Sequence, residues 1–208
     1  RIGNWTLKGR AGEGLKRSPA IVFPLPRRAS RSDASPVRLP RLCFPVAFLC
    51  VAALLARCEA QKSLNAFIHL DPDAAKAAAR RSDERRSAGR AGPLEGLALV
   101  LKDNIDTATM PTTAGTPALR GHRPKKDAAV AAKLIGAGAV ILGKTNLHEL
   151  AYGISNNNAA FGAARNPYDP TRIPGASSGG TGIAVAARMA PAGLGSDPGG
   201  SCDCVARG

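Results

Sequence analysis

The sequence has few aromatic residues and few histidines. Aromatic residues make up 4% of the 208 residues, and the three histidines are His69, His122 and His148. All three precede G-A-S-S-G at 175–179, which matches the G-x-S-x-G pattern of a nucleophilic serine. In hydrolases with that pattern the histidine follows the serine along the chain. The residues present therefore do not predict a serine–histidine–acid triad.

Metal-binding patterns are also missing. The five cysteines include no C-x-x-C pair, and the closest spacing is the C-x-C formed by Cys202 and Cys204. Such a pair alone is a weak indication of a metal site. An odd number of cysteines without a paired framework is typical of a reduced protein. We therefore expect no metal, no cofactor and a cytoplasmic location.

No apolar run reaches the length of a membrane span. The longest, LCFPVAFLCVAALLA at 42–56, is shorter than the roughly 20 apolar residues that a spanning helix needs. A signal peptide is one alternative, because basic residues precede the run and its length fits. The continuation VAALLARCEAQ places Arg57, Glu59 and Gln61 on a polar face, as in an amphipathic helix. We favour the helix and expect no membrane association.

Positive charge is abundant but unevenly distributed. The formal net charge is +14, and residues 1–60 contain eleven Lys/Arg against three Asp/Glu. This part is rich in Pro, Ser and Arg, and it has no helical period and no interleaved aromatic residues. We interpret residues 1–50 as a disordered or non-native segment and expect no nucleic-acid partner. A basic arm that binds nucleic acid is the alternative.

From about residue 62 the pattern becomes regular. The apolar run 97–101 and the run 139–143 predict buried strands. Helical patterns cover 71–88, 127–138, 144–153 and 181–190. A strand, a helix and a second strand in this order predict an α/β fold.

GAVILGKT at 138–145 matches the phosphate-loop pattern G-x-x-x-x-G-K-[ST] letter for letter. In a phosphate loop a strand precedes the first glycine, and the four variable residues form the loop. Here a helical pattern precedes Gly138, and the four variable residues, 139–142, are strand residues. We therefore expect no ATP binding at this segment.

Three other stretches combine groups suited to acyl transfer. Lys102 ends a buried strand, where lysine is rare, and serines lie among glycines in PGASSGGTG and GLGSDPGGS. Glycines let backbone N–H groups approach a developing oxyanion, and a desolvated lysine can serve as the base for a serine. Two interpretations stay open from the residues alone: a serine–lysine acyl-transfer site, and glycine–serine loops that only turn the chain.

These stretches together resemble the amidase signature family. The similarity covers GLALVLKDNIDTATMPTTAGTPAL, DAAVAAKLIGAGAVILGKTNLHELAYGISNNN and FGAARNPYDPTRIPGASSGGTGIAVAARMAPAGLGSDPGGS, from about residue 52 to Ser201. Within the family, the sequence is most similar to mandelamide and indoleacetamide hydrolases. The resemblance implies a mixed sheet core flanked by helices. It also implies that residues 51–208 are the N-terminal part of the domain, truncated after the nucleophile.

The family uses a Ser-cisSer-Lys triad. The resemblance therefore implies that Lys102 is the base, Ser177 the serine at a cis peptide bond, and Ser201 the nucleophile. It further implies oxyanion or positioning roles for Pro198, Gly199, Gly200, Ser178, Asn104 and Asp197. The expected reaction is hydrolysis of a small carboxamide through an acyl-enzyme, with the amide as the partner molecule. Formation of a homo-oligomer stays open.

The sequence departs from the family at two places. Pro198 stands where the family has Thr or Ile, and proline lacks the N–H that could serve as an oxyanion donor. After Ser201 the sequence S-C-D-C-V-A-R-G differs from the family continuation and stops. Two alternatives to a carboxamide hydrolase remain: the A subunit of a glutamyl-tRNA(Gln)-type amidotransferase, which shares the triad, and a non-catalytic remnant of the family.

Overall fold

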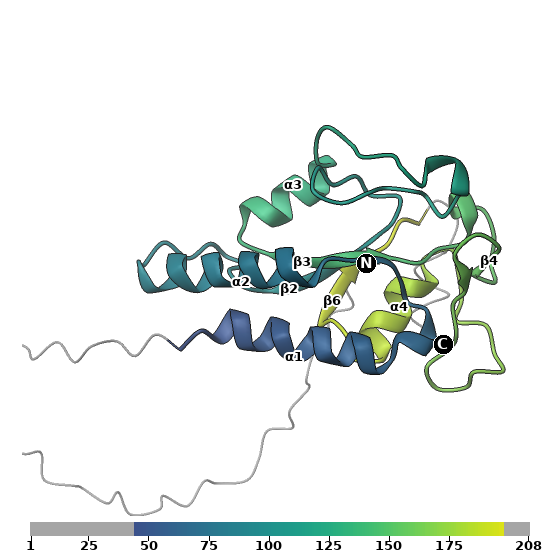
Figure 1. The fold of residues 1–208 in the computed structure, drawn as a ribbon, viewed down its shortest axis with the longest axis horizontal. Helices are drawn as coiled ribbons and strands as arrows, with labels where there is room; N and C mark the ends of the chain where they lie inside the picture. Colours follow the sequence, from purple (N-terminus) through teal and green to yellow (C-terminus); the bar gives the residue numbers. More distant parts are fainter. Residues whose placement is uncertain (1–43, 198–208) are drawn as a thin grey trace, which may run out of the picture. The chain divides into compact units, whose positions relative to one another are not determined.

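A computed structural model describes residues 44–197 of the chain (Figure 1). The main helices are α1 (Val46–Ala60), α2 (Pro72–Ser87), α3 (Ala129–Gly136) and α4 (Gly179–Ala186). The strands are β1 (Phe67–Leu70), β2 (Ala98–Lys102), β3 (Val140–Thr145), β4 (Asn157–Asn158), β5 (Gly162–Ala163) and β6 (Ala192–Leu194). Helix α1 thus begins before the segment boundary expected at residue 50, and the expectation of disorder for 1–43 lies outside the described residues.

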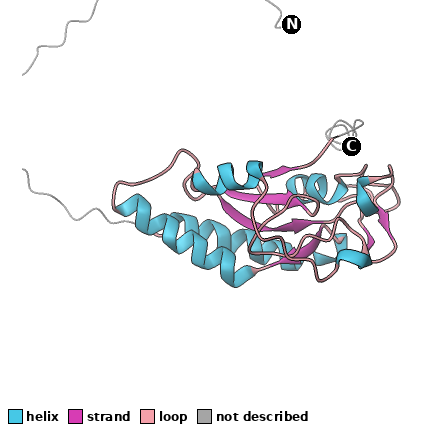
Figure 2. Ribbon diagram, turned by 90° about the horizontal axis from the view of Figure 1, so that it is seen from above, coloured by secondary structure: helices cyan, strands magenta, loops and turns pink. Residues whose placement is uncertain are grey.

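The central sheet is mixed, as expected from the sequence. Its strand order is β1-β3-β2-β6, with β2 parallel to both β3 and β6 and β1 antiparallel to β3. Helix α3 connects the parallel neighbours β2 and β3, which is the usual crossover for parallel strands. The strands lie between helices (Figure 2). The α/β prediction is therefore confirmed.

Helix α1 is fixed at its start by a carboxylate of α2. The backbone N–H groups of Ala47 and Phe48 donate to the two oxygens of Asp83, at 3.0 and 2.9 Å. The first N–H groups of a helix have no partner within the helix, so a buried carboxylate satisfies them and complements the helix dipole. This contact pairs the start of α1 with the later turns of α2.

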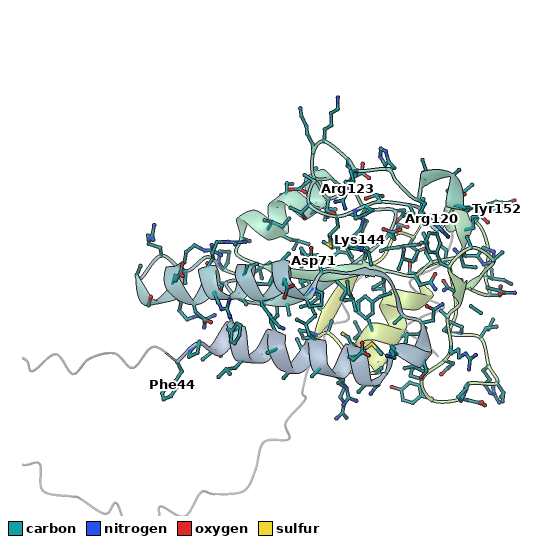
Figure 3. The ribbon with its side chains drawn as sticks, viewed as in Figure 1. Phe44, Asp71, Arg120, Arg123, Lys144 and Tyr152 are labelled. Atoms are coloured by element: carbon teal, nitrogen blue, oxygen red, sulfur yellow. The ribbon has the colours of Figure 1, made fainter. Side chains whose placement is uncertain are left out.

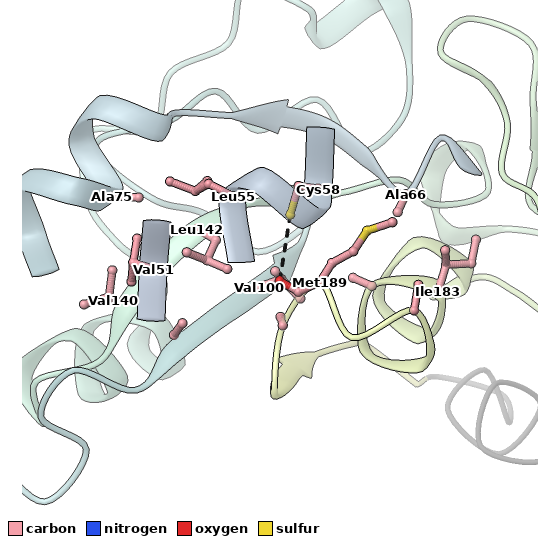
Figure 4. Close-up of a cluster of buried hydrophobic side chains, with 14 of the residues drawn as sticks. Val51, Leu55, Cys58, Ala66, Ala75, Val100, Val140, Leu142, Ile183 and Met189 are labelled. Carbon is pink, nitrogen blue, oxygen red and sulfur yellow. Dashed lines mark hydrogen bonds between the residues drawn. The ribbon is translucent and has the colours of Figure 1, made fainter. Parts of the chain in front are cut away.

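The main core lies between α1, α2, α4 and one face of the sheet. Helix α1 contributes Val51, Leu55 and Cys58 at helical spacing, and these pack in one cluster with Val100 of β2 and Leu142 of β3 (Figure 4). The thiol of Cys58 donates to the carbonyl of Met189 at 3.8 Å. Burial raises the pKa of the Cys58 thiol to about 11, so it remains protonated at neutral pH.

A second, smaller cluster covers the opposite face. Leu101 of β2 and Ile105 pack with Ala131 of α3, and Ile141 and Leu194 adjoin them. Because β2 has all five residues buried, it is covered on both faces. This explains why its sequence is an uninterrupted apolar run that ends in Lys102.

One sequence expectation is wrong. The predicted short helix at 144–153 is absent: β3 continues through Thr145, and only a single 3-10 turn follows, at Glu149–Ala151. Leu150 and Ala151 have φ values of 53° and 56°, which no right-handed helix accommodates. The structure also adds β1, β4, β5 and β6, which the sequence analysis did not assign.

Gly180, near the start of α4, allows that helix to approach closely the backbone just before β1 and just after β3. A Cβ atom at this position would lie under 3.0 Å from backbone atoms of Ala66 and Asn146. We expect Gly180→Ala to destabilise the fold by about 1–3 kcal/mol, because rigid backbone must move to admit the methyl group. Denaturant titration measures this. Gly136→Ala, where a Cβ meets no atom within 4 Å, is the control, and equal effects of the two variants would contradict the account.

Candidate active site

The candidate site lies where the parallel strands end. Lys102, the last residue of β2, is paired in register with Thr145, the last residue of β3. On the other side of β2, β6 ends at Leu194 and leads directly to Ser196. The carboxyl ends of parallel strands meet at one edge of a sheet, which is where α/β proteins usually place ligands and reacting groups.

The amine of Lys102 is fully buried and surrounded by oxygen atoms. Its Nζ donates to Ser177 Oγ at 2.7 Å, to Ser178 Oγ at 3.0 Å and to the carbonyl of Ser196 at 3.2 Å. The structure thus brings together Lys102 and both serines of the glycine-rich stretch, although 75 positions of sequence separate Lys102 from Ser177. The distance of 2.7 Å is within the range for direct proton transfer.

The serine pair is held by α4 and by the turn after β3. The peptide bond between Ala176 and Ser177 is cis, and Ser178 immediately precedes α4. The carbonyl of Ser177 accepts a hydrogen bond from the backbone N–H of His148 at 3.3 Å. The first turn of α4 is tied to the end of β3 by the 2.7 Å hydrogen bond between the hydroxyls of Thr145 and Thr181.

Ser196 is a site residue that the sequence analysis missed. Its carbonyl accepts from Lys102 and from Ser178 Oγ, each at 3.2 Å, and its hydroxyl accepts from Asn104 Nδ2 at 2.9 Å. Asn104, expected to orient the triad, therefore reaches Lys102 through Ser196. Ser196 stands in the same GLGSDPGGS stretch as Ser201, and that proximity was the only available signal.

A second buried lysine lies on the neighbouring strand β3, where it is paired in register with Leu101. Lys144 of β3 forms an ion pair with Asp103 at 3.2 Å, and both side chains are fully buried. The desolvation of Lys144 lowers the pKa of its amine, and the charge of Asp103 partly offsets that effect. In Figure 3, Lys144 lies inside the fold, whereas Phe44 and Tyr152 project at its periphery. The GKT of the phosphate-loop match is thus part of the buried strand β3, whereas the sequence pattern had assigned Lys144 and Thr145 to a helix.

The remaining candidate residues lie at, or beyond, the end of the part that the structure describes. Asp197 is exposed. Pro198, Gly199, Gly200 and Ser201 lie outside the described residues, so their roles stay predictions. Within residues 44–197, no group of three His, Cys, Asp or Glu side chains could hold a metal ion. Within the same range, no helix is long and apolar enough to span a bilayer.

Comparison with known proteins identifies the class of this fold and site. A model of the family described as Amidase matches residues 50–204. The chain is 53% identical over 151 residues to the A subunit of the glutamyl-tRNA(Gln) amidotransferase of Chloroflexus aurantiacus. That match covers 72% of this chain and 31% of the relative.

Solved structures agree with this assignment. The peptide amidase of Stenotrophomonas maltophilia is 43% identical, with a TM-score of 0.73 over 77% of this chain and 34% of that one. The A subunit of the Thermotoga maritima amidotransferase is 34% identical, with a TM-score of 0.65 over 77% of this chain and 33% of that one. The chain therefore belongs to the amidase family, and it spans about a third of the length of these relatives. The comparisons do not single out mandelamide or indoleacetamide hydrolases.

Proposed function

We propose that this chain carries the catalytic lysine and serines of an enzyme that hydrolyses small carboxamides. The observation that supports the proposal most directly is the set of contacts of Lys102, whose buried amine touches the hydroxyls of Ser177 and Ser178. A buried amine held against two serine hydroxyls is well placed to exchange protons with them. Membership of the amidase family supports the same chemistry.

The proposed reaction moves protons along one line of side chains. Lys102, as the neutral amine, accepts a proton from Ser177, and Ser177 accepts one from Ser201. Ser201 Oγ then forms a bond to the amide carbon, and the C–N bond breaks as the leaving nitrogen receives a proton through Ser177. In the second half, water loses a proton through Ser177 to Lys102 and attacks the ester. Ser201 receives that proton back as the carboxylate product leaves. Each proton removed in the first half is returned to the leaving group, so Lys102 ends as it began.

Ammonia release from purified chain tests the substrate class. The panel contains aliphatic, aromatic and amino-acid carboxamides, and Ser201→Ala is the inactive control. The proposal expects ammonia from at least one simple carboxamide with no other protein present. Mandelamide and indoleacetamide belong in the panel, because the motifs favour them. If the folded chain releases no more ammonia than Ser201→Ala from every amide, the proposed hydrolase activity is rejected for this chain.

A second function is favoured by the 53% identity to the A subunit of an amidotransferase. In that case the chain belongs to an enzyme that transfers an amide nitrogen to glutamyl-tRNA(Gln), and it works with other subunits. The same Lys102–Ser177 relay would activate the nucleophile in that enzyme. The two functions separate in one assay, because the amidotransferase requires partner subunits and charged tRNA whereas the hydrolase requires neither. The cytoplasmic location fits both functions and stays a prediction.

Pro198 is expected to limit the rate. If the N–H of this position donates to the oxyanion in the family, proline removes that donor, and one lost donor costs about 10²-fold in rate. Pro198→Thr should therefore raise the hydrolysis rate by up to about 10²-fold. The measurement is kcat on a carboxamide found in the panel, and Pro167→Thr, in the loop after β5, is the matched control. An unchanged kcat in Pro198→Thr would show that this N–H does not matter here.

A further inference from the structure

We propose that the buried Asp103–Lys144 ion pair is a positioning device that holds the amine of Lys102 against Ser177. This inference rests on the proposed function, since it gives the pair a role in the same relay. Asp103 and Lys144 are hydrogen-bonded to backbone groups and to threonine hydroxyls, so we assign them as positioning residues and not as catalytic ones. Their effect on the reaction would pass through the backbone that they fix.

The first argument is the set of polar contacts around Lys144. Besides Asp103, its Nζ donates to Thr112 Oγ1 at 2.8 Å and to the carbonyl of Pro111 at 3.2 Å. The buried ammonium group therefore has two hydrogen-bond acceptors and one ion-pair partner, Asp103 Oδ1, whose contact does not have hydrogen-bond geometry. A fully buried charge is costly unless it is paired and hydrogen-bonded in this way. The arrangement fixes the 111–113 segment to the end of β3.

The second argument is the place of Asp103 in the chain, directly after Lys102. Its backbone N–H donates to the carbonyl of Thr145 at 3.1 Å, and its own carbonyl accepts from Ala114 at 2.9 Å. Its carboxylate also accepts hydrogen bonds from the backbone N–H and the hydroxyl of Thr113. Consecutive Cα atoms are about 3.8 Å apart, so a shift of Asp103 displaces Lys102 as well.

The third argument is that the same network reaches the serine side of the relay. The carbonyl of Ala114 accepts from Leu150 at 2.8 Å, and the turn 148–151 is closed by a 2.8 Å bond from Ala151 to His148. The N–H of His148 in turn donates to the carbonyl of Ser177 at 3.3 Å. The buried pair is thus connected through successive hydrogen bonds to both ends of the Lys102–Ser177 contact.

The test is the rate at which a fluorophosphonate probe labels Ser201 in full-length variants. We expect Lys144→Met to slow labelling by about 100-fold, the penalty for a misplacement of about 1 Å at a reacting group. Lys62→Met is the matched control, because it removes an exposed lysine that pairs with Glu59 at 2.5 Å. We expect Lys62→Met to label at the parent rate.

A double variant separates positioning from simple charge balance. Asp103→Asn with Lys144→Met leaves no unpaired buried charge, so a merely structural pair predicts that labelling recovers. Positioning predicts that labelling stays slow while the thermal melt remains cooperative. If the other variants fail to fold, Thr112→Val tests the same role, because it keeps both charges. It should slow labelling by roughly tenfold, since it removes one hydrogen bond of Lys144. Recovery in the double variant, or a parent rate in Thr112→Val, overturns the proposal.

A second readout does not depend on the proposed function. Acetic anhydride modifies accessible neutral amines, and peptide mass spectrometry compares Lys102 with the exposed Lys125 in the same molecule. We expect Lys102 to be protected in the parent and roughly tenfold more reactive in the double variant, because the released strand end opens locally. If the parent does not label at Ser201, the proposed function fails while this comparison still decides the positioning role. Unchanged protection of Lys102 in the double variant contradicts it.

Discussion

Replacing Lys102 with methionine is expected to lower amide hydrolysis by about 10²- to 10⁴-fold, the usual contribution of a positioned acid–base group. Methionine has a similar length but cannot accept a proton, so the relay loses its terminal base. The hydroxyls of Ser177 and Ser178, which now lie 2.7 and 3.0 Å from the amine, lose their nitrogen partner. The measurement is the initial rate of ammonia release or of probe labelling at Ser201.

The control for this prediction is again Lys62→Met, which makes the same substitution at a side chain that is 75% exposed. A thermal melt of both variants shows whether the fold is retained. Three oxygen atoms each lose a hydrogen bond from the buried amine, so we expect the melting temperature to fall while the melt stays cooperative. A Lys102→Met variant that hydrolyses carboxamides at the parent rate would remove Lys102 from the mechanism.

Replacing Ser177 with alanine is expected to have a loss of the same order, about 10²- to 10⁴-fold. In the proposed relay Ser177 passes protons in both directions, and its hydroxyl lies 2.7 Å from the amine of Lys102. Groups that act in one relay are strongly non-additive. The double variant Lys102→Met/Ser177→Ala should therefore be hardly slower than either single variant.

Ser87→Ala provides the matched control for Ser177→Ala. Ser87 ends α2, and its hydroxyl donates to the carbonyl of Glu84 at 2.8 Å on an exposed surface. Its removal should leave the rate unchanged. Multiplicative losses in the Lys102→Met/Ser177→Ala double variant would show that the two side chains act independently, contrary to the relay.

The strands that were predicted from the sequence are those whose burial produces a run of apolar residues. Strand β2 is buried on both faces, and β3 has five of its six residues buried, so each begins with an apolar run. Strand β1 has only partly buried residues, and β6 is three residues long with none of them fully buried. Neither carries a periodic signal that a single sequence could show, because pairing with neighbouring strands defines them.

The residues of the candidate site also differ in how far local sequence patterns could predict them. Lys102 and the serines of PGASSGGTG stood out because a lysine in an apolar strand and serines among glycines are chemically unusual, and the resemblance to the amidase signature family then assigned the roles of Lys102 and Ser177. Ser196 was missed because its role depends on a carbonyl and a hydroxyl that meet Lys102 and Asn104 from more than 90 positions away. The pairing of Asp103 with Lys144 was missed for the same reason. Contacts of this kind are created by the parallel pairing of β2 with β3 and with β6, which local patterns do not specify.

The central claim is that Lys102 activates Ser201 through Ser177. The most direct measurement is labelling of the purified chain with a fluorophosphonate probe, with the modified residue located by peptide mass spectrometry. The account predicts labelling at Ser201 in the parent chain, and its loss in Lys102→Met and in Ser177→Ala. Labelling at another serine, or labelling at Ser201 that persists in Lys102→Met, would contradict it. So would a chain that melts cooperatively and takes up no probe.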